Sequence, residues 1–226
     1  MSNSRAPEAI LFDLDGTLID SFHLYLEAYR RALTPYLGRR PELEDFVARR
    51  PSAERAFLAE WIGAERADEC HSAMCRHYSD LFPSLSEGVY EGVPEMLAAL
   101  RSAGYPLGIV TGKGRALWEV THGAIPLGDF DVVVTEDDVQ HVKPDPAGLL
   151  LAASRLGLDV EAAVYIGDSP SDLEAGRRAG MRIGAALWPK SAEGEKEQFI
   201  EAVQALRPDW LFERPAAVTR ALAGWC

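Results

Sequence analysis

Cysteine, lysine and long apolar runs are all scarce in this chain of 226 residues. The 3 cysteines show neither a disulfide framework nor the spacing of a metal site, so we expect free thiols. No apolar run reaches about 18 residues, so we expect no helical membrane span. The first residues, MSNSRAPEAI, lack the basic and then apolar pattern of a signal peptide. We therefore expect a cytoplasmic protein.

Negative charge dominates the composition. The formal net charge is −12 and the pI is about 4.9, which argues against a nucleic acid or an anionic membrane as partner. An anionic small molecule stays possible, because a metal ion, a lysine and backbone amides can reverse the field at one site. The 47% hydrophobic content supports a sizeable core, in one large domain or one domain with a smaller insert.

The chain has two kinds of region with different sequence patterns. Residues 20–88 read as successive helices, the first of which we expect to end at Pro35 and Gly38. From about residue 90, short apolar strands alternate with helices, which is typical of βαβ units in a parallel sheet. We predict an α/β fold with a doubly wound parallel sheet and an inserted all-helical cap. The core domain would comprise residues 1–19 and 89–226, and the cap residues 20–88.

Two aspartates stand where the first apolar strand ends, in AILFDLDGT. Asp13 and Asp15 are i and i+2, so on an extended chain both carboxylates point to the same side. Two carboxylates at that separation repel each other unless a cation or a shared proton lies between them. The carboxyl end of a strand in an open α/β sheet is also where ligands bind. The alternative is a turn cap beside a solvated aspartate.

Two later strand ends carry residues suited to a phosphate. Thr111 and Gly112 follow the strand YPLGIV, and a hydroxyl with a glycine amide can donate two hydrogen bonds to one phosphate oxygen. Lys143 lies just before a helix and is followed by Pro144. The chain has 4 lysines against 19 arginines, which makes a random surface lysine at this position less expected. A helix cap and a solvated loop lysine are the alternatives.

The strand AAVYIG ends in a further acidic pair. Ser169 and Pro170 predict the N-cap and first residue of a helix, with Asp172 in its first turn. Asp168 stands at the strand tip, where no helix dipole explains it. Mg²⁺ takes one or two carboxylates together with water and substrate phosphate. Asp13, Asp168 and the carbonyl of Asp15 would meet that need, with Asp172 nearby or bound through water.

The motifs DLDGT, VTGK, KP and GDSPSD occur in this order at successive strand ends. Together they resemble the haloacid dehalogenase-like hydrolase superfamily, over a core from about Ile10 to Trp210. A helical insert directly after the first motif is similar to the cap of the phosphoglycolate phosphatase and β-phosphoglucomutase branch. The resemblance implies a Rossmann-like core that uses Mg²⁺.

The resemblance also implies a mechanism. Asp13 would be the nucleophile that takes the phosphoryl group as an aspartyl phosphate. Asp15 would protonate the leaving oxygen and then activate water. Lys143 and Mg²⁺ would hold charge on the phosphoryl oxygens, with Thr111 and the Gly112 amide orienting them. The acid at position 15 argues against a true dehalogenase. The lack of any lysine in residues 20–88 removes a Schiff-base mechanism in the cap.

The substrate is less determined than the chemistry. We expect a small phosphorylated metabolite, of the phosphoglycolate or sugar-phosphate type, with a β-phosphoglucomutase-like mutase or a pyrophosphatase as alternatives. VTGK resembles the pyrophosphatase-like members. Arg49 and Arg50 in the cap are candidates for a substrate carboxylate or second phosphate, against the alternative of solvated helix arginines. We expect a monomer or a homodimer, with neither nucleic acid nor membrane as partner.

Overall fold

The computed structural model describes most of the chain, namely residues 6–47, 53–86, 88–190, 192 and 194–222. Two compact units divide the chain. Unit 1 comprises residues 1–20, 89–111 and 127–226, and unit 2 comprises residues 21–88 and 112–126. Unit 2 therefore includes a segment, 112–126, that the predicted domains assign to the core. The domain boundaries themselves stay a prediction.

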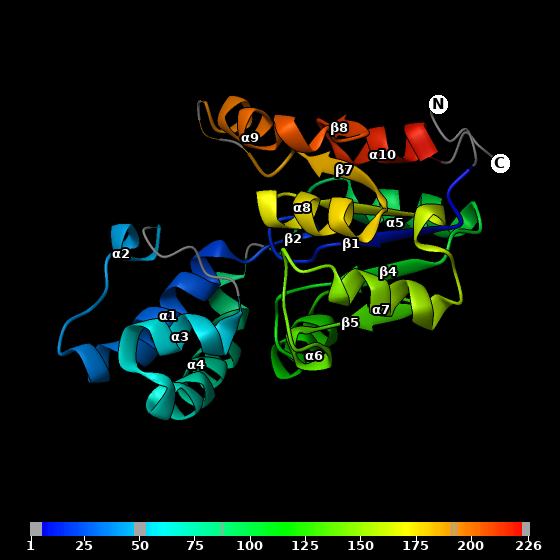
Figure 1. Cartoon of the computed structure of the whole chain (residues 1–226). Helices are drawn as coiled ribbons and strands as arrows, with labels where there is room; N and C mark the ends of the chain where they lie inside the picture. The colour runs from blue at the N-terminus through cyan, green and yellow to red at the C-terminus, as the bar shows by residue number, and fades with distance from the viewer. Residues whose placement is uncertain (1–5, 48–52, 87, 191, 193, 223–226) are drawn as a thin grey trace. The chain divides into compact units, whose positions relative to one another are not determined.

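Unit 1 is built on one six-stranded sheet, in the order β5-β4-β1-β6-β7-β8, with every neighbouring pair parallel (Figure 1). Its strands are β1 (Ala9–Phe12), β4 (Leu107–Val110), β5 (Val132–Val134), β6 (Ala163–Gly167), β7 (Arg182–Ala186) and β8 (Trp210–Phe212). All residues of β1, β4 and β6 are buried, as a parallel sheet covered on both faces requires. The predicted fold class is confirmed.

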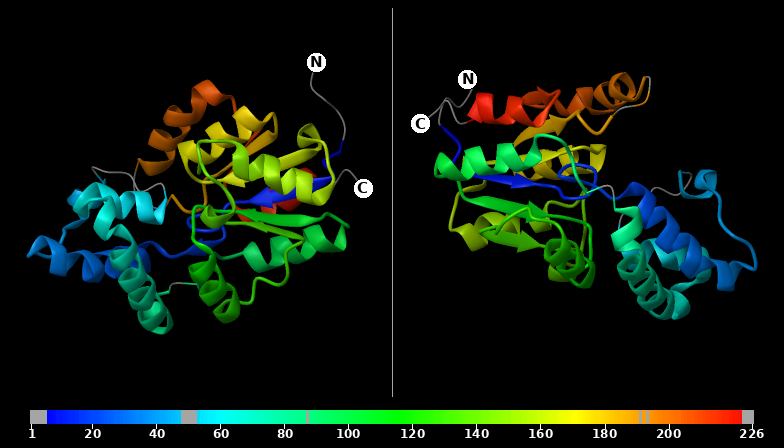
Figure 2. Two further views of the ribbon diagram at one scale, coloured as in Figure 1. Left: turned by 60° about the horizontal axis from the view of Figure 1, so that its bottom comes forward. Right: turned by 180° about the vertical axis from the view of Figure 1, so that it is seen from behind.

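Helices cover both faces of this sheet (Figures 1 and 2). On one face, α7 (Ala147–Leu156) and α8 (Pro170–Ala179) pack on Leu11 and Tyr165, and α9 (Glu195–Val203) packs beside α8. On the other face, α5 (Val93–Ser102) and α10 (Pro215–Leu222) pack against each other. Three 3₁₀ turns complete the unit: η1 (Glu136–Asp138), η2 (Val160–Ala162) and η3 (Gln204–Leu206).

The parallel direction of the strands places the site. Because β1, β4, β6 and β7 are neighbours and run the same way, their carboxyl ends lie at one edge of the sheet. The residues that follow these strands therefore share that edge, which is where open α/β sheets bind ligands. The residues that follow β1, β4 and β6 in three of the sequence motifs are brought together in this way, whereas the KP motif lies after β5 and η1.

Unit 2 is helical. Its helices are α1 (Phe22–Leu37), α2 (Leu43–Val47), α3 (Glu54–Ile62), α4 (Ala64–Leu85) and α6 (Arg115–Ala124). Aromatic side chains fill its core: the ring of Tyr29 lies edge-on to Phe57 at 5.1 Å, and Phe46 lies 5.4 Å from Trp61. Rings of this size bury much apolar area in a small volume, with a further gain from edge-to-face geometry. The unit thus has a core of its own.

The first helix ends at one of its two expected stop residues. Pro35 lies inside α1, which continues to Leu37 and ends at Gly38 with a φ of 66°. A proline removes one backbone donor inside a helix. The acceptor that Pro35 leaves without an N–H donor is the carbonyl of Arg31. The hydroxyl of Thr34 donates to the neighbouring carbonyl, that of Arg30, at 2.6 Å. The left-handed glycine, rather than the proline, is the stop signal.

A separate two-stranded sheet pairs β2 (Ile19–Asp20) with β3 (Gly88–Val89). Among the described residues, no helix has both the length and the apolar character that crossing a membrane requires.

Candidate active site

Asp13 directly continues β1 at the carboxyl edge of the sheet. Its backbone N–H donates to the carbonyl of Ile166 at 2.9 Å, so the strand pairing with β6 extends to this residue. The side chain of Asp13 is buried, whereas Asp15 is half-buried. The strand thus fixes the backbone beneath one carboxylate and leaves the second more open to solvent.

The chain turns sharply after the two aspartates. Gly16 has a φ of +83°, a left-handed conformation that glycine adopts without strain. The N–H groups of Leu18 and Ile19 both donate to the carbonyl of Leu14, which closes the turn. A Cβ on Gly16 would lie 2.8 Å from both carboxylate oxygens of Asp168. The glycine of DLDGT therefore makes room for the aspartate of another motif.

Lys143 forms the centre of the site. Its Nζ donates to Asp13 Oδ1 at 2.7 Å and to Asp172 Oδ1 at 2.6 Å. The hydroxyl of Tyr165, at 3.0 Å, and the carbonyl of Val110, at 3.3 Å, accept as well. The structure thus brings together three predicted residues that lie far apart in the chain, and the ammonium is held by two carboxylates at once.

The GDSPSD segment forms the cap of α8 as predicted. Ser169 is the N-cap and Pro170 the first helical residue. Asp172 Oδ2 accepts from the Ser169 hydroxyl at 2.6 Å and from the Ser169 N–H at 3.0 Å, a reciprocal capping arrangement. With its other oxygen on Lys143, Asp172 is bonded at both carboxylate oxygens. It is therefore rigidly placed.

Asp168 stands at the tip of β6 as expected. Its Oδ1 accepts from the Thr17 hydroxyl at 3.0 Å, and its Oδ2 lies 2.7 Å from Lys190 Nζ. Ligand oxygens of Asp13, Asp168 and Asp172 all lie within 4.8 Å of one another. Convergent hard oxygen donors of this kind suit a small divalent cation such as Mg²⁺. The donor set present therefore fits the predicted metal.

Burial and like charge act on the ionisation of the cluster. Burial raises the pKa of Asp13, and Asp172 and Asp168 raise it further, against the opposing effect of Lys143. Burial also raises the pKa of Asp168, partly offset by Lys190. For Asp172, the bonds from Lys143 and Ser169 outweigh burial and lower the pKa. The lysines beside Asp13 and Asp168 therefore do not fully offset the effect of burial and of the neighbouring carboxylates. A divalent cation would supply the remaining positive charge.

Lys143 responds in the opposite sense. Burial lowers the pKa of its ammonium, but the charges of Asp13 and Asp172 outweigh burial and hold the pKa above its ordinary value. The lysine is therefore fixed as a cation. A permanent positive charge beside Asp13 is what a transferring phosphoryl group would need.

Thr111 and Gly112 follow β4, the strand beside β1. The N–H of Thr111 donates to the carbonyl of Val134 at 3.0 Å, so its backbone is fixed at the same sheet edge, and its side chain is buried. Gly112 belongs to unit 2. Helix α6 begins at Arg115, with Gly114 as its N-cap. Both residues stay predicted phosphate ligands.

Three polar residues of the site were not predicted: Tyr165, Thr17 and Lys190. Tyr165 lies within a buried strand, where the sequence predicts an ordinary core residue. Lys190 gave a usable signal, since it is one of 4 lysines in the chain and follows a strand. Thr17 belongs to the DLDGT motif, but nothing in the sequence connects its hydroxyl with Asp168. Side chains that meet across strands leave no pattern along the chain.

Unit 2 contains a second polar cluster. Glu54 accepts from the Tyr25 hydroxyl at 2.9 Å and from the Gly114 N–H at 3.3 Å, while its other oxygen lies 2.8 Å from His71 Nε2. Burial lowers the pKa of His71, but its interactions with Cys75 and Glu54 prevail and raise it to about 9. Glu54 is the closer partner, because its oxygen lies 2.8 Å from His71 Nε2, whereas the sulfur of Cys75 lies 3.7 and 3.8 Å from the two ring nitrogens.

The lysine of VTGK is also buried in unit 2. Lys113 Nζ donates to the Tyr78 hydroxyl at 2.7 Å and to the Thr121 hydroxyl at 3.2 Å. The ring of Tyr25 lies 4.8 Å from the same ammonium, at cation–π distance. These contacts join segment 112–126 to α1 and α4. The predicted cap residues Arg49 and Arg50 lie outside the described residues.

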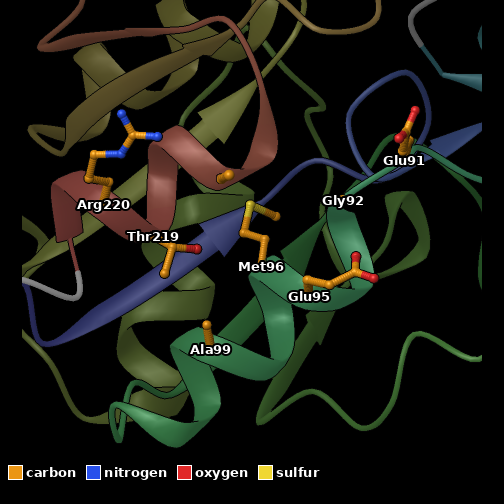
Figure 3. Close-up of a pocket in the computed structure, with 8 residues that line it drawn as sticks. Glu91, Gly92, Glu95, Met96, Ala99, Thr219 and Arg220 are labelled. Atoms are coloured by element: carbon orange, nitrogen blue, oxygen red, sulfur yellow. The ribbon is translucent and has the colours of Figure 1, made fainter.

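A groove of about 560 Å³ lies elsewhere in unit 1, between α5 and α10 (Figure 3). Glu91, Glu95, Met96, Thr219 and Arg220 are among the residues that line it. None of the predicted site residues does. The carboxylate cluster is therefore distinct from this groove.

Comparison with known proteins agrees with this geometry. The profile of the family described as haloacid dehalogenase-like hydrolase matches residues 10–186. The chain belongs to this family. Within it, the chain is a phosphatase-type hydrolase of the phosphoglycolate phosphatase and β-phosphoglucomutase-like branch. The matched residues include the DLDGT, VTGK, KP and GDSPSD motifs.

Several curated relatives of this hydrolase carry the name pyrophosphatase PpaX. The protein from Bacillus velezensis is 38% identical over 210 residues, which are 91% of this chain and 92% of that protein. The protein from Bacillus cereus is 34% identical over 209 residues, with 91% of each chain covered. The likeness therefore extends over both units.

Solved structures share the fold. One from Lactobacillus plantarum, assigned as a phosphoglycolate phosphatase, is 25% identical with a TM-score of 0.79, over 96% of this chain and 99% of that one. One from Thermotoga maritima, assigned as a β-phosphoglucomutase, is 27% identical with a TM-score of 0.73, over 97% of this chain and 100% of that one.

Proposed function

We propose that this hydrolase cleaves inorganic pyrophosphate with Mg²⁺, through a phosphoryl group carried on Asp13. The observation that carries the chemistry is the placement of Lys143 Nζ, 2.7 Å from Asp13 Oδ1 and 2.6 Å from Asp172 Oδ1. A buried carboxylate held by a fixed cation beside two further aspartates suits a nucleophile that works next to a metal. The names of the 38% and 34% identical relatives support pyrophosphate as the substrate.

The predicted site residues divide the work of this reaction. The carboxylate of Asp13 attacks phosphorus, and the bond to the leaving phosphate oxygen breaks as the aspartyl phosphate forms. Asp15 gives a proton to the leaving oxygen and then takes one from the water that hydrolyses the intermediate. The balance is one pyrophosphate and one water consumed, and two phosphates released. The half-buried position of Asp15 suits a group that exchanges protons with substrate and water.

Positive charge offsets the negative charge that develops on the phosphoryl oxygens. Lys143 favours the ionised form of Asp13 and faces the transferring group, with Thr111 and the Gly112 amide orienting its oxygens. Asp13, Asp168 and the Asp15 carbonyl would hold Mg²⁺, with Asp172 alongside. When bound, the metal supplies charge neutralisation on the phosphate. Arg49 and Arg50 stay predicted substrate contacts.

Phosphate release from a panel of compounds tests the proposal. The panel holds pyrophosphate, phosphoglycolate and sugar phosphates, each assayed with Mg²⁺ and with EDTA. We expect release from pyrophosphate to depend on Mg²⁺ and to fall below detection in Asp13→Asn. Asp159→Asn, an exposed aspartate outside the site, is the matched control and should keep wild-type activity. Release by Asp13→Asn at the wild-type rate would remove Asp13 as nucleophile.

A phosphomonoester is the second candidate substrate. It is the class expected from the sequence, and the Lactobacillus plantarum structure supports it. Faster release from phosphoglycolate than from pyrophosphate in the same panel would make this candidate the substrate. A mutase would instead show phosphoryl transfer between two sugar positions without net phosphate release. We propose that the protein acts as a monomer or homodimer in the cytoplasm.

A further inference from the structure

The loop after β7 brings a second lysine to the carboxylate cluster. Lys190 Nζ lies 2.7 Å from Asp168 Oδ2, at the carboxyl edge of the sheet. Its side chain is 22% exposed, against 12% for Lys143. Lys143 is bonded to two carboxylates, whereas Lys190 contacts one and stays more open to solvent. The two ammonium groups therefore differ in how readily they could meet an incoming anion.

The backbone that presents Lys190 is fixed. Leu187 N–H donates to the carbonyl of Phe212 at 2.9 Å, and Lys190 N–H donates back to the carbonyl of Leu187 at 3.1 Å. The indole N–H of Trp188 donates to the carbonyl of Thr17 at 2.9 Å, in the turn that follows Asp13 and Asp15. The loop is thus tied directly to the DLDGT motif. The ammonium stands on a flexible stem, with Asp168 Oδ2 at 2.7 Å and the centre of the Phe199 ring at 5.3 Å.

The partner of Lys190 is one of the predicted metal ligands. Asp168 accepts from Thr17 on one oxygen and from Lys190 on the other. An ammonium and a divalent cation that share one carboxylate repel each other. Occupation of Asp168 by a metal would therefore weaken its hold on Lys190. The released ammonium would lie beside the phosphoryl site without a strong counter-charge.

We propose that Lys190 is a specificity-determining residue, which binds the second phosphoryl group of a substrate that carries two adjacent phosphoryl groups. This inference rests on the proposed function of the same site and names the group that selects the substrate class. A diphosphate carries more negative charge than a phosphomonoester and extends it beyond the transferring group. One compact ammonium at the rim of the site, on a flexible stem, suits that second anion.

Binding measurements test the role without turnover. Methylenediphosphonate serves as a diphosphate that is not hydrolysed, and inorganic phosphate as the single-phosphoryl ligand, both titrated by calorimetry with Mg²⁺ present. In Lys190→Met we expect the dissociation constant for the diphosphonate to rise about tenfold or more, because one charge-assisted hydrogen bond is lost. That for phosphate should change by less than about threefold. Lys190→Arg should recover part of the loss.

A matched control and kinetics complete the design. Lys196→Met removes another lysine of unit 1, whose Nζ lies 2.9 Å from Glu213 Oε2 at the surface, and should leave both affinities unchanged. In Lys190→Met, the KM for pyrophosphate should rise while the KM for p-nitrophenyl phosphate stays near the wild-type value. Mg²⁺ affinity without substrate should rise in Lys190→Met, because a competing cation has been removed from Asp168.

Several outcomes would overturn the inference. Equal weakening of both ligands in Lys190→Met would mean a general charge effect, and no weakening would leave Lys190 as a structural ion pair. Unchanged Mg²⁺ affinity would contradict the shared use of Asp168. If the wild type hydrolyses only phosphomonoesters but binds the diphosphonate through Lys190, the proposed substrate fails and the inference stands. If the wild type binds the diphosphonate no more tightly than phosphate, the inference fails whatever the enzyme hydrolyses.

Discussion

Individual side chains in this protein owe their ionisation to buried partners. Asp13 and Lys143 are paired in unit 1, and Glu54 and His71 are paired in unit 2. Burial alone would favour the neutral forms of Asp13, Lys143 and His71. The pairing keeps the cations charged, and it makes each remaining partner costly to expose alone. Such pairs connect stability with pH, and the His71 pair lies outside the predicted metal site.

The Glu54–His71 pair predicts a loss of stability at alkaline pH. The pKa of His71 is about 9 in the folded chain, above the ordinary value of 6.5. A raised pKa contributes stability that is fully present below pH 6.5 and is lost as the pH rises through about 9. The contribution is up to about 3 kcal/mol. Urea unfolding across this pH range should show the decline in the wild type and a smaller decline in Glu54→Gln.

His77 provides the control for this prediction. It lies on the same helix as His71, outside the pair with Glu54. His77→Asn should keep the wild-type dependence of unfolding free energy on pH. If the wild type and Glu54→Gln lose the same free energy between pH 6.5 and 9, the pair does not hold His71 as a cation.

Among the elements, the turns after the strands do most to shape the site. The strands supply a rigid edge. Asp13 and Asp168 stand directly after β1 and β6, whereas Lys143 lies farther along the chain, between η1 and α7. The turn after β1 depends on Gly16, whose left-handed φ of +83° and missing Cβ both matter. The turn after β7 is fixed through Trp188 and carries Lys190. Small backbone changes in these turns therefore move carboxylates.

Gly16→Ala tests that dependence. The new Cβ would lie 2.8 Å from both oxygens of Asp168, and a left-handed alanine costs about 1 kcal/mol in strain. We expect Mg²⁺ affinity to fall about tenfold or more, because Asp168 has to move, together with a modest loss of stability. Calorimetric titration with Mg²⁺ and urea unfolding measure the two effects.

Gly38→Ala separates strain from displacement. Gly38 also has a positive φ, 66°, but nothing lies within 4 Å of a Cβ built there. This variant should lose a similar amount of stability while its Mg²⁺ affinity stays at the wild-type value. An unchanged Mg²⁺ affinity in Gly16→Ala would show that Asp168 is not a ligand or tolerates the methyl group.

For the chain as a whole, negative charges repel one another, and several of them lie close together at the site. The formal net charge is −12, and Asp13, Asp15, Asp168 and Asp172 all belong to unit 1 near one sheet edge. A divalent cation that binds the folded chain there stabilises it by mass action. Salt also screens the general repulsion of the surface charges. Measurements of stability at constant ionic strength distinguish specific cation binding from general screening.

Mg²⁺ should therefore stabilise the folded chain beyond the effect of salt. At a concentration about 100 times the dissociation constant, we expect the unfolding free energy to rise by about 2.7 kcal/mol. Urea unfolding with Mg²⁺, and with NaCl at the same ionic strength, measures the difference. Asp168→Asn should abolish the specific part, and Asp159→Asn should keep it. Equal stabilisation by the two salts would argue against a specific site.

The fold class and the core motifs could be predicted because their signals are local. Apolar runs such as Ala9–Phe12 mark buried strands, and Ser169 followed by Pro170 marks a helix start. In a parallel sheet the strand ends share an edge, so Asp13 and Asp168 were expected at one place, whereas Lys143 was expected there from the KP motif and the family resemblance. The structure brings all three to one site. The positions of the two aspartates follow from periodicity and chain direction.

Contacts across the fold could not be read from the chain in the same way. The Tyr165 hydroxyl on Lys143, the Lys190 ion pair with Asp168 and the Glu54–His71 pair each join residues from different elements. Segment 112–126 groups with the helical unit, where Lys113 and Thr121 both bond to the hydroxyl of Tyr78. The local amino-acid sequence determines the backbone preferences and the strand ends. Which side chains meet depends on packing between distant segments, because burial makes each polar group take the partner that the fold places beside it.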